Sequence, residues 1–304
     1  MTGRRHPRLL LSLATLFWAG NFVLGRAVRG HVPPVGLAFW RWTVALLLLV
    51  AFSWRGIAAQ WRLLARRWMV VLVLGILGVG NFNVFVYIGL RETEATNALL
   101  LNAACPALIV AITFLSGQGR ASARQLAGIA LSLAGVSVIL TQGRAAALLD
   151  FRFNPGDVWV LAAVLSWAFY TVLLARRPAG VDPLVLLTAL VAVGVAWIAP
   201  FYAWEISRGV TMRLDATTAG AVFYVAVFAS VLAYAFWNAG VGALGANRAG
   251  VFANLMPAFG SILAVALLGE SFHLFHGAGI GLIFAGVYLA GRGSAPRAEA
   301  PEAG

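Results

Sequence analysis

The sequence has few charged residues and no lysine. Only 11% of its 304 residues are charged and 62% are hydrophobic, whereas a soluble globular domain averages about 25% and about 45–50%. The net charge of +12 comes from arginines that lie singly or in pairs between apolar stretches. They form no basic face with interleaved aromatic residues, so we expect no nucleic-acid partner. The composition predicts a chain that lies mostly in lipid.

Residues that carry catalysis or bind metals are scarce in the apolar stretches. The single cysteine, Cys105, cannot form an internal disulfide and leaves the redox compartment open. All carboxylates and histidines lie at the ends of apolar stretches, in links or in the tails. The chain has no H-E-x-x-H, no G-x-S-x-G with a partner histidine and no nucleotide-binding motif. We therefore expect no cofactor and no ATP hydrolysis, and a membrane-embedded enzyme is a remote alternative.

One loop has the spacing of a metal site, because Glu270, His273 and His276 recur every three residues. A loop with two histidines and one acid seldom holds a metal, however, and Glu270 also belongs to the family motif described below. We expect no bound metal.

Runs of about 20 apolar residues, the length that crosses a bilayer as a helix, fill most of the chain. They predict an all-α integral membrane protein with ten transmembrane helices, at 9–28, 34–54, 68–90, 94–117, 124–142, 156–177, 182–206, 216–238, 244–268 and 273–291. No small-x-small cleavage site ends the first run, so we expect a retained helix and not a signal peptide. Residues 55–67 form an Arg-rich link that is expected to be solvated, and the alternative is an amphipathic helix lying on anionic lipid. Residues 293–304 have the composition of a disordered tail.

The second half of the chain repeats the first at an offset of 151 residues. Among the identical pairs are Pro106/Pro257, Ala127/Ala278, Gly128/Gly279, Gly135/Gly286 and Val136/Val287. Proline and glycine are the informative matches, because their backbone geometry is hard to replace. Residues 1–142 and 156–292 are thus two copies of a five-span unit, joined by a link at 143–155. An odd number of spans makes the second copy enter the membrane upside down, and inverted repeats of this kind are typical of secondary transporters with a central site.

The arginines also predict the orientation of the chain. With the N-terminus in the cytoplasm, about twice as many arginines fall on the cytoplasmic side as on the outside, as the positive-inside rule requires. Both termini are then cytoplasmic, in a bacterial cytoplasmic (inner) membrane.

Three motifs indicate a family. The first span contains TLFWAGNFVLGRA and the sixth VLSWAFYTVLLARR, with Trp18 and Trp167 at equivalent places, and the ninth contains Pro257 and ends in Leu268-Gly269-Glu270. In this order they resemble the EamA family of the drug/metabolite transporter superfamily, whose members have Trp-Ala or Trp-Gly in spans one and six and a proline-bearing ninth span ending Leu-Gly-Glu. Within that family the chain is most similar to the YddG-type aromatic amino-acid exporters. The first copy has Ser116-Gly117-Gln118-Gly119 at the position of the Leu-Gly-Glu end, so that feature is present only once.

The resemblance implies a secondary transporter that exports small metabolites, and the residues themselves indicate amino acids, aromatic ones included. Polar side chains inside a membrane are costly and tend to face the bundle interior. Amides can hydrogen-bond both an ammonium and a carboxylate, and aromatic rings can stack on the substrate or hold its cation. The candidate substrate-binding residues are Trp18, Asn21, Asn83, Tyr87, Asn102, Trp167, Tyr170, Tyr234, Trp237 and Asn254. The alternatives are interhelical hydrogen bonds for the amides, and core packing or an interfacial belt for the rings. Trp18 and Trp167 lie too deep in their spans for a belt, unlike the tryptophans near the span ends.

Other intramembrane residues are assigned to hinges or to packing. Pro106 and Pro257 each remove a helical hydrogen bond in mid-span, so they are candidate hinges for alternating access or static kinks. Small residues indicate close helix packing, at Gly128, Ser132 and Gly135 on span five and at Gly277 and Gly281 on span ten.

A single arginine, Arg41, lies about two turns inside the second span. It is expected to snorkel outward or to pair with Glu92 or Glu94, and the alternative is contact with a substrate carboxylate. No acid lies at a midplane to carry a proton, so transport is predicted to be facilitated diffusion or to be coupled only through groups at the rim. A multidrug or other metabolite efflux carrier is the main alternative function.

Overall fold

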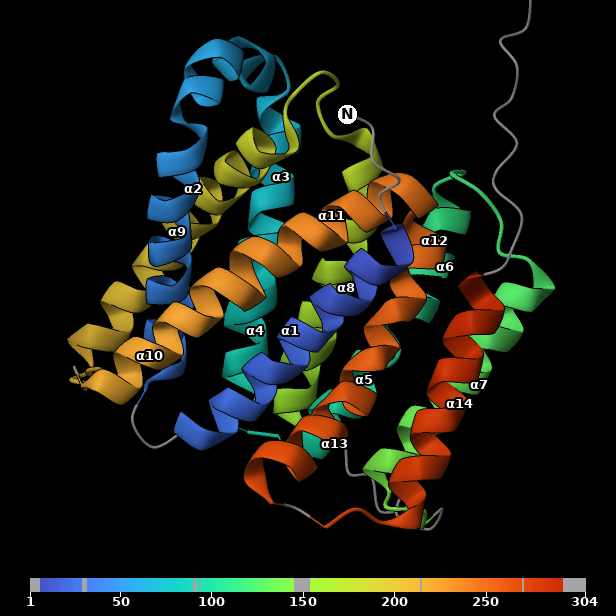
Figure 1. Ribbon diagram of the computed structural model, residues 1–304. Helices are drawn as coiled ribbons and strands as arrows, with labels where there is room; N and C mark the ends of the chain where they lie inside the picture. The colour runs from blue at the N-terminus through green and yellow to red at the C-terminus, as the bar shows by residue number, and fades with distance from the viewer. Residues whose placement is uncertain are drawn as a thin grey trace, which may run out of the picture.

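The computed structural model describes residues 6–28, 32–89, 92–93, 95–144, 154–213, 215–269 and 271–291. The regular elements in these ranges are helices, and none of the described residues forms a strand (Figure 1). Eight helices among them are long and apolar enough to cross a membrane: Val35–Arg66, Trp68–Val86, Ala123–Leu140, Pro155–Arg176, Pro183–Ser207, Ala216–Leu244, Ala246–Leu267 and Leu274–Gly291. The prediction of an all-helical multi-pass protein is confirmed.

The α-helices follow one another as α1 (Pro7–Val28), α2 (Pro34–Arg66), α3 (Trp68–Gly75), α4 (Phe82–Gly89), α5 (Ala95–Asn102), α6 (Cys105–Leu115), α7 (Ala123–Leu140), α8 (Pro155–Leu173), α9 (Pro183–Ser207), α10 (Ala216–Tyr224), α11 (Ala233–Leu244), α12 (Ala246–Gly250), α13 (Leu255–Leu268) and α14 (Leu274–Gly291). The first and fourth predicted spans correspond to α1 and to the interrupted pair α5 and α6, so the count of ten spans stays a prediction. Helix α2 continues to Arg66, past its predicted end at residue 54, and the Arg-rich link is therefore helical.

Irregular helical turns occur at matching places in the two halves. A stretch of π-helix, η1 (Ile76–Asn81), joins α3 to α4, and another, η4 (Val225–Leu232), joins α10 to α11. The chain leaves the α-helix at residues 103–104 between α5 and α6, and it passes through a 3₁₀ turn, η5 (Val251–Asn254), between α12 and α13.

The two candidate hinge prolines explain the second pair of irregular turns. Pro106 and Pro257 follow these turns by two or three residues. A proline has no N–H for the carbonyl four residues earlier, and its ring clashes with that carbonyl. The carbonyls concerned belong to Asn102 and Ala253, where the α-helix is interrupted in each case.

The helices of the two halves pack against one another in corresponding pairs. Helices α2 and α9 lie together at one side of the molecule, and α7 and α14 lie together at the opposite side (Figure 1). Between them, α1 packs against α11 and α13, and α8 packs in the same manner against α4 and α6. The centre of the bundle is therefore where α1, α4, α8 and α11 meet.

Glycines allow the backbones of α7 and α14 to touch. A Cβ atom added at Gly128 would lie 2.6 Å from the carbonyl oxygen of Gly286, and one added at Gly135 would lie 2.6 Å from that of Gly279. Ser132, between the two glycines of α7, is fully buried. The close-packing prediction is therefore correct for α7.

The prediction of close packing was wrong for the two glycines of span ten, which lie on α14. No atom lies within 4 Å of a Cβ added at Gly281, and one added at Gly277 meets only the Phe272 ring at 3.8 Å. Gly279 and Gly286 lie seven residues apart, two turns along one face, and that face meets α7. Gly277 and Gly281 lie on a different face of α14.

A buried carboxylate from one half caps a helix of the other. Glu205, near the end of α9, is 2% exposed. Its carboxylate oxygens accept hydrogen bonds from the backbone N–H groups of Val35 (3.3 Å) and Gly36 (2.7 Å), in the first turn of α2. An anion at a helix N-terminus satisfies free N–H groups and interacts favourably with the helix dipole.

Replacing Glu205 by alanine is expected to lower the free energy of unfolding by about 1–3 kcal/mol, because two buried N–H groups lose their acceptor. The matched control is Asp182→Ala, which removes an exposed N-cap that accepts from Leu184 N at 2.8 Å and should cost about 1 kcal/mol. Melting temperatures of the purified variants in detergent measure both effects. A smaller loss for Glu205→Ala than for Asp182→Ala would contradict the capping role.

Candidate functional site

Five of the predicted site residues pack together at the centre of the bundle. Trp18 comes from α1, Trp167 and Tyr170 from α8, and Tyr234 and Trp237 from α11. The Trp18 ring lies 5.2 Å from Trp167, 5.8 Å from Tyr234 and 5.3 Å from Trp237, measured between ring centroids. Trp167 also lies 5.1 Å from Tyr170 and 5.4 Å from Tyr234. We call these five residues the aromatic cluster.

Two further rings, absent from the predicted set, extend the aromatic cluster. Trp42 of α2 meets Tyr234 edge-to-face with centroids 4.9 Å apart, and Phe82 of α4 lies 5.3 Å from Trp167. Tyr170, Trp42 and Trp237 are fully buried, whereas Trp18 is partly exposed. Trp18 is therefore the ring of the cluster that a small molecule can reach with the least rearrangement.

Backbone carbonyls of the two π-helical stretches hold the polar ends of these side chains. Trp18 Nε1 donates to the Ala229 carbonyl of η4 at 2.9 Å, and the Tyr234 hydroxyl donates to the Gly78 carbonyl of η1 at 2.7 Å. Each bond joins a side chain of one half to a π-helical carbonyl of the other. Single π-helical turns inside α-helices are frequent at functional sites, and here they orient the rings of the cluster.

Tyr170 has a side-chain partner that the candidate set did not include. Its hydroxyl donates to Asn238 Oδ1 at 2.6 Å. Asn238 lies four residues after Tyr234 on α11, so helical spacing was the sequence signal that placed it on the same face as the cluster.

Removal of the Tyr170 hydroxyl leaves Asn238 Oδ1 without its donor, because the ring of phenylalanine cannot donate. Tyr170→Phe is expected to destabilise the protein by about 1 kcal/mol, seen as a lower melting temperature in detergent. Ser207→Ala, which removes an exposed hydroxyl bonded only to Trp204 O at 2.7 Å, is the control. Equal melting temperatures for Tyr170→Phe and the unmodified protein would contradict this role.

Arg41 turns into the bundle. Its side chain is 3% exposed, so it does not snorkel. Its nitrogen atoms donate to Ser230 Oγ (2.9 Å), Asn83 Oδ1 (3.3 Å) and the Ala229 carbonyl (3.3 Å), and its guanidinium carbon lies 5.1 Å from the centre of the Trp42 ring. Within the described part of the chain no carboxylate pairs with it, and Glu94 lies outside that part. The expectation of snorkelling or of pairing with Glu92 was wrong, because acceptors from η4, distant in the sequence, surround the guanidinium.

Three of the predicted amides have three different environments. Asn83 joins the site through Arg41, and its Nδ2 donates to Val79 O at 3.0 Å. Asn21 lies one turn beyond Trp18, and its buried Oδ1 has no hydrogen-bond donor among the described residues. Asn254 instead donates to Ser132 Oγ at 2.8 Å on α7, which is the interhelical packing contact given above as the alternative.

Two other candidates, Asn102 and Tyr87, also have no described contact with the aromatic cluster. Asn102 is the last residue of α5, beside the interruption before α6, and is half-buried. Tyr87 lies in α4, but its side chain is outside the described residues.

In the loop considered as a metal site, the described contacts of His276 are with neighbouring residues of the same loop. The His273 backbone N–H donates to His276 Nδ1 at 3.0 Å, and the Phe275 ring lies 4.2 Å from the His276 ring. Glu270 lies outside the described residues.

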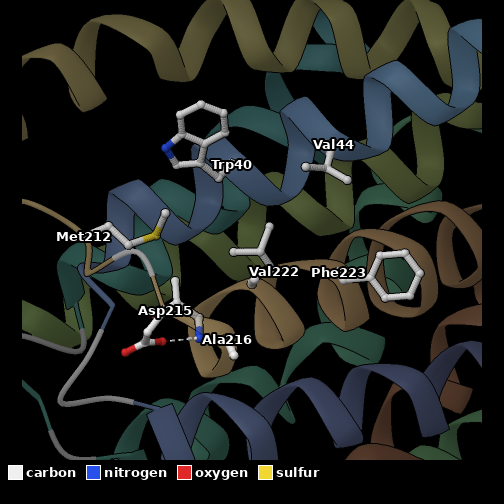
Figure 2. A pocket seen from close by; sticks show the side chains of 9 residues that line it. Trp40, Val44, Met212, Asp215, Ala216, Val222 and Phe223 are labelled. Atoms are coloured by element: carbon white, nitrogen blue, oxygen red, sulfur yellow. Dashed lines mark hydrogen bonds between the residues drawn. The ribbon is translucent and has the colours of Figure 1, made fainter.

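A separate pocket of about 610 Å³ lies between α2 and α10 (Figure 2). Its lining is mainly apolar and consists of Trp40, Val44, Met212, Asp215, Ala216, Thr218, Ala219, Val222 and Phe223. At its rim Asp215 caps α10 by accepting from Thr218 N at 2.8 Å. Trp40 faces this pocket and donates to the Tyr202 hydroxyl at 2.9 Å, while the next residue, Arg41, faces the interior.

Comparison with known proteins gives the class to which this fold and site belong. The EamA-like transporter family matches residues 8–141 and matches again at residues 154–292. The chain belongs to the EamA-like transporter family, as the motifs around Trp18, Trp167 and Pro257 predicted.

Individual relatives are similar over nearly their whole length. An uncharacterized transporter of Archaeoglobus fulgidus is 32% identical over 95% of this chain and 98% of its own. A probable amino-acid metabolite efflux pump of Salmonella typhimurium is 29% identical, with 94% of each chain covered. The uncharacterized inner membrane transporter YicL of the same organism is 25% identical, covering 99% of this chain and 100% of its own.

A solved crystal structure is similar as well. It superimposes with a TM-score of 0.75 at 25% sequence identity, covering 95% of this chain and 97% of that chain. The helical arrangement described here is therefore that of a known fold.

Proposed function

We propose that this protein is a secondary transporter that exports amino acids, aromatic ones included, from the cytoplasm by alternating access and without ATP. The observation that carries the proposal is the aromatic cluster, in which Trp18 of the first half contacts Trp167, Tyr234 and Trp237 of the second. A site at the junction of two halves can change its exposure when the halves rock against each other. The efflux pump of Salmonella typhimurium is named for amino-acid metabolites, which supports this substrate class.

The proposed architecture is ten transmembrane helices in two inverted five-helix repeats around the central site. The repeats are residues 1–142 and 156–292, with the link 143–155 between them and a tail at 293–304. The two family matches begin and end near these limits. The corresponding pairs of packed helices and the corresponding π-helical stretches also support the assignment.

The proposed substrate site uses the aromatic cluster as its apolar wall. The partly exposed Trp18 ring would stack on the side chain of the substrate, and Trp167 and Tyr234 would hold Trp18 in place from behind. The unpartnered Oδ1 of Asn21, one turn along α1, is an acceptor suited to the substrate ammonium. Asn83, Tyr170 and Trp237 position the side chains around it, whereas Asn102 and Tyr87 remain candidates only.

Pro106 and Pro257 are the proposed hinges. Each follows an interruption in its helix, and an interrupted helix can bend without breaking further backbone hydrogen bonds. Bending of both would move α6 and α13 against α8 and α1, which they contact.

The proposed mode of transport is facilitated diffusion. In the described chain the two fully buried carboxylates, Asp157 and Glu205, lie at helix ends and cap α8 and α2. Neither is near the cluster to carry a proton with the substrate. Accumulation of phenylalanine against its gradient in proteoliposomes, driven by an imposed pH gradient alone, would contradict this mode.

The proposed location is the bacterial cytoplasmic membrane, with both termini in the cytoplasm. The arginine distribution predicts that orientation, and YicL of Salmonella typhimurium is named as an inner membrane protein. Cysteine tags at the two ends, tested with an impermeant thiol reagent in whole cells, should both be unreactive.

Export from cells tests the substrate class. Bacteria fed a phenylalanine-containing dipeptide accumulate free phenylalanine, and cells that express this protein should release it several-fold faster than cells with an empty vector. Dipeptides of tryptophan, methionine and glutamate extend the panel. Unchanged amino-acid release together with faster loss of a lipophilic cation such as ethidium would contradict amino-acid export and would indicate multidrug efflux.

A further inference from the structure

Arg41 is a buried cation surrounded by neutral acceptors. A guanidinium has five N–H donors, and three of them are used by Ser230 Oγ, Asn83 Oδ1 and the Ala229 carbonyl. The other two have no acceptor among the described residues. The side chain is 3% exposed, so bulk water does not compensate for the lack of an anionic partner among the described residues.

Two further N–H donors, one beside Arg41 and one in the aromatic cluster, also lack acceptors among the described residues. The indole nitrogens of Trp42 and Trp237 are buried and have no hydrogen-bond partner in the described part of the chain. Trp42 lies beneath the guanidinium at 5.1 Å, and its ring contacts Tyr234 of the aromatic cluster. Buried polar groups are nearly always hydrogen-bonded. A positive charge with spare donors on one side of the cluster therefore indicates a site for an anionic, acceptor-rich group.

The fold itself does not require this charge. Pro34 and Pro183 each begin the second helix of their half, and at that offset of 149 residues the counterpart of Arg41 is Leu190, which is fully buried. Leucine thus fills the equivalent place in the second half. An unpaired charge in a membrane is costly, and its neutral partners here would accept as well from an uncharged amide.

We propose that Arg41 binds the carboxylate of the transported solute. This inference rests on the proposed function and narrows it, because every good substrate must then have a carboxylate. Arginine and carboxylate form parallel N–H···O bonds that fix orientation, and the substrate side chain would then extend over the Trp18 ring. A solute without a carboxylate leaves the guanidinium unpaired, and binding sites reject such analogues strongly.

Two analogues of phenylalanine test the inference on the unmodified protein. 3-Phenylpropionate keeps the carboxylate and lacks the amine, whereas phenethylamine keeps the amine and lacks the carboxylate. In proteoliposomes that perform phenylalanine counterflow, 3-phenylpropionate should compete at a concentration at least about tenfold lower than phenethylamine. Equal competition, or stronger competition by phenethylamine, would overturn the inference.

Variants of Arg41 assign that preference to this side chain. Arg41→Gln should raise the half-saturating phenylalanine concentration about tenfold to a hundredfold and remove the preference for 3-phenylpropionate. Arg41→Lys keeps a positive charge but lacks the planar guanidinium, so it should recover part of the affinity for phenylalanine and part of the preference for 3-phenylpropionate. The matched control is Arg62→Gln, because Arg62 is an exposed arginine of the same helix whose guanidinium carbon lies 5.6 Å from the Trp61 ring; it should behave as the unmodified protein.

The outcomes separate this inference from the proposed function. Counterflow of phenylalanine with the carboxylate preference intact in Arg41→Gln overturns the role of Arg41 and leaves the function standing. Absence of counterflow for phenylalanine and every other amino acid tested, in the unmodified protein, overturns both. If Arg41→Gln does not fold, the competition between the two analogues on the unmodified protein still decides whether the site requires a carboxylate. The weakened preference expected for Arg41→Lys then assigns that requirement to Arg41, and an unchanged preference in Arg41→Lys overturns the assignment.

Discussion

Trp18→Ala is expected to reduce phenylalanine counterflow about tenfold or more in proteoliposomes, and to lower the melting temperature without preventing folding. The Trp18 ring contacts Trp167, Tyr234 and Trp237, and its indole nitrogen bonds the Ala229 carbonyl across the two halves. Aromatic pairs contribute about 0.5–1.5 kcal/mol each beyond the area they bury. Removal of the Trp18 ring therefore takes away the surface on which the substrate stacks, together with the contacts that hold the neighbouring rings in place. Because Trp18 is partly exposed, its loss should affect binding more than folding.

Trp167→Phe and Trp204→Ala complete this experiment. Trp167 is 5% exposed, and phenylalanine keeps a ring in the cluster while it reduces the stacking area, so an intermediate loss of counterflow is expected. Trp204 on α9 is 58% exposed and lies outside the cluster, so its replacement by alanine should leave counterflow unchanged. Equal rates for Trp18→Ala and Trp204→Ala would contradict the proposed site.

Gly286→Leu is expected to prevent correct assembly of the bundle or to lower its melting temperature strongly. A Cβ at Gly286 would lie 2.5 Å from the Gly128 carbonyl oxygen and 2.5 Å from Ser132 N. Both are backbone atoms of α7 that cannot rotate away, so α14 must move outward along its whole contact. Overpacking of a rigid contact costs about 1–3 kcal/mol and sometimes more, and close helix packing is a main source of association in lipid.

Gly281→Leu is the matched control for that change. It adds the same side chain to the same helix, but nothing lies within 4 Å of its Cβ position. Size-exclusion profiles and melting temperatures in detergent compare the two variants. A melting temperature for Gly286→Leu within a degree or two of that for Gly281→Leu would show that the helices are not in backbone contact.

The main features predicted from the sequence come from strong signals. Apolar runs near the thickness of a bilayer predicted the helices, and the Trp-Ala motifs with Pro257 predicted the family. Depth in the span distinguished Trp18 and Trp167 from the tryptophans at the ends, and the structure brings these two rings into contact. Each of these signals is local, or repeats at a fixed offset.

The features that were missed depend on partners distant in the sequence. Arg41 was expected to snorkel or to pair with a carboxylate, and its actual acceptors Ser230 and Ala229 were missed. They lie on η4 in the other half, and no local sequence pattern predicts them. The π-helical stretches were not predicted, since no glycine or proline pattern distinguishes a π-helical turn from an α-helical one. Close packing was expected at Gly277 but occurs at Gly279, because spacing along α14 does not say which face of that helix meets α7.

Asn254 illustrates the same limit within the candidate site. Its position in a proline-bearing span fits either a path-lining amide or a packing contact, and only the placement of Ser132 on α7 distinguishes the two. The same holds for Trp42, which was not a candidate although its ring is fully buried against Tyr234.

Counterflow of labelled phenylalanine in proteoliposomes, at equal pH on both sides and without ATP, tests the central claim most directly. Liposomes preloaded with unlabelled phenylalanine should show a transient overshoot of labelled phenylalanine, and its initial rate should saturate with external concentration. The overshoot arises because the carrier that brings label in carries mostly unlabelled phenylalanine out. Preloaded and empty protein-containing liposomes that take up label equally, at a rate that rises linearly with concentration, would contradict transport of amino acids by alternating access.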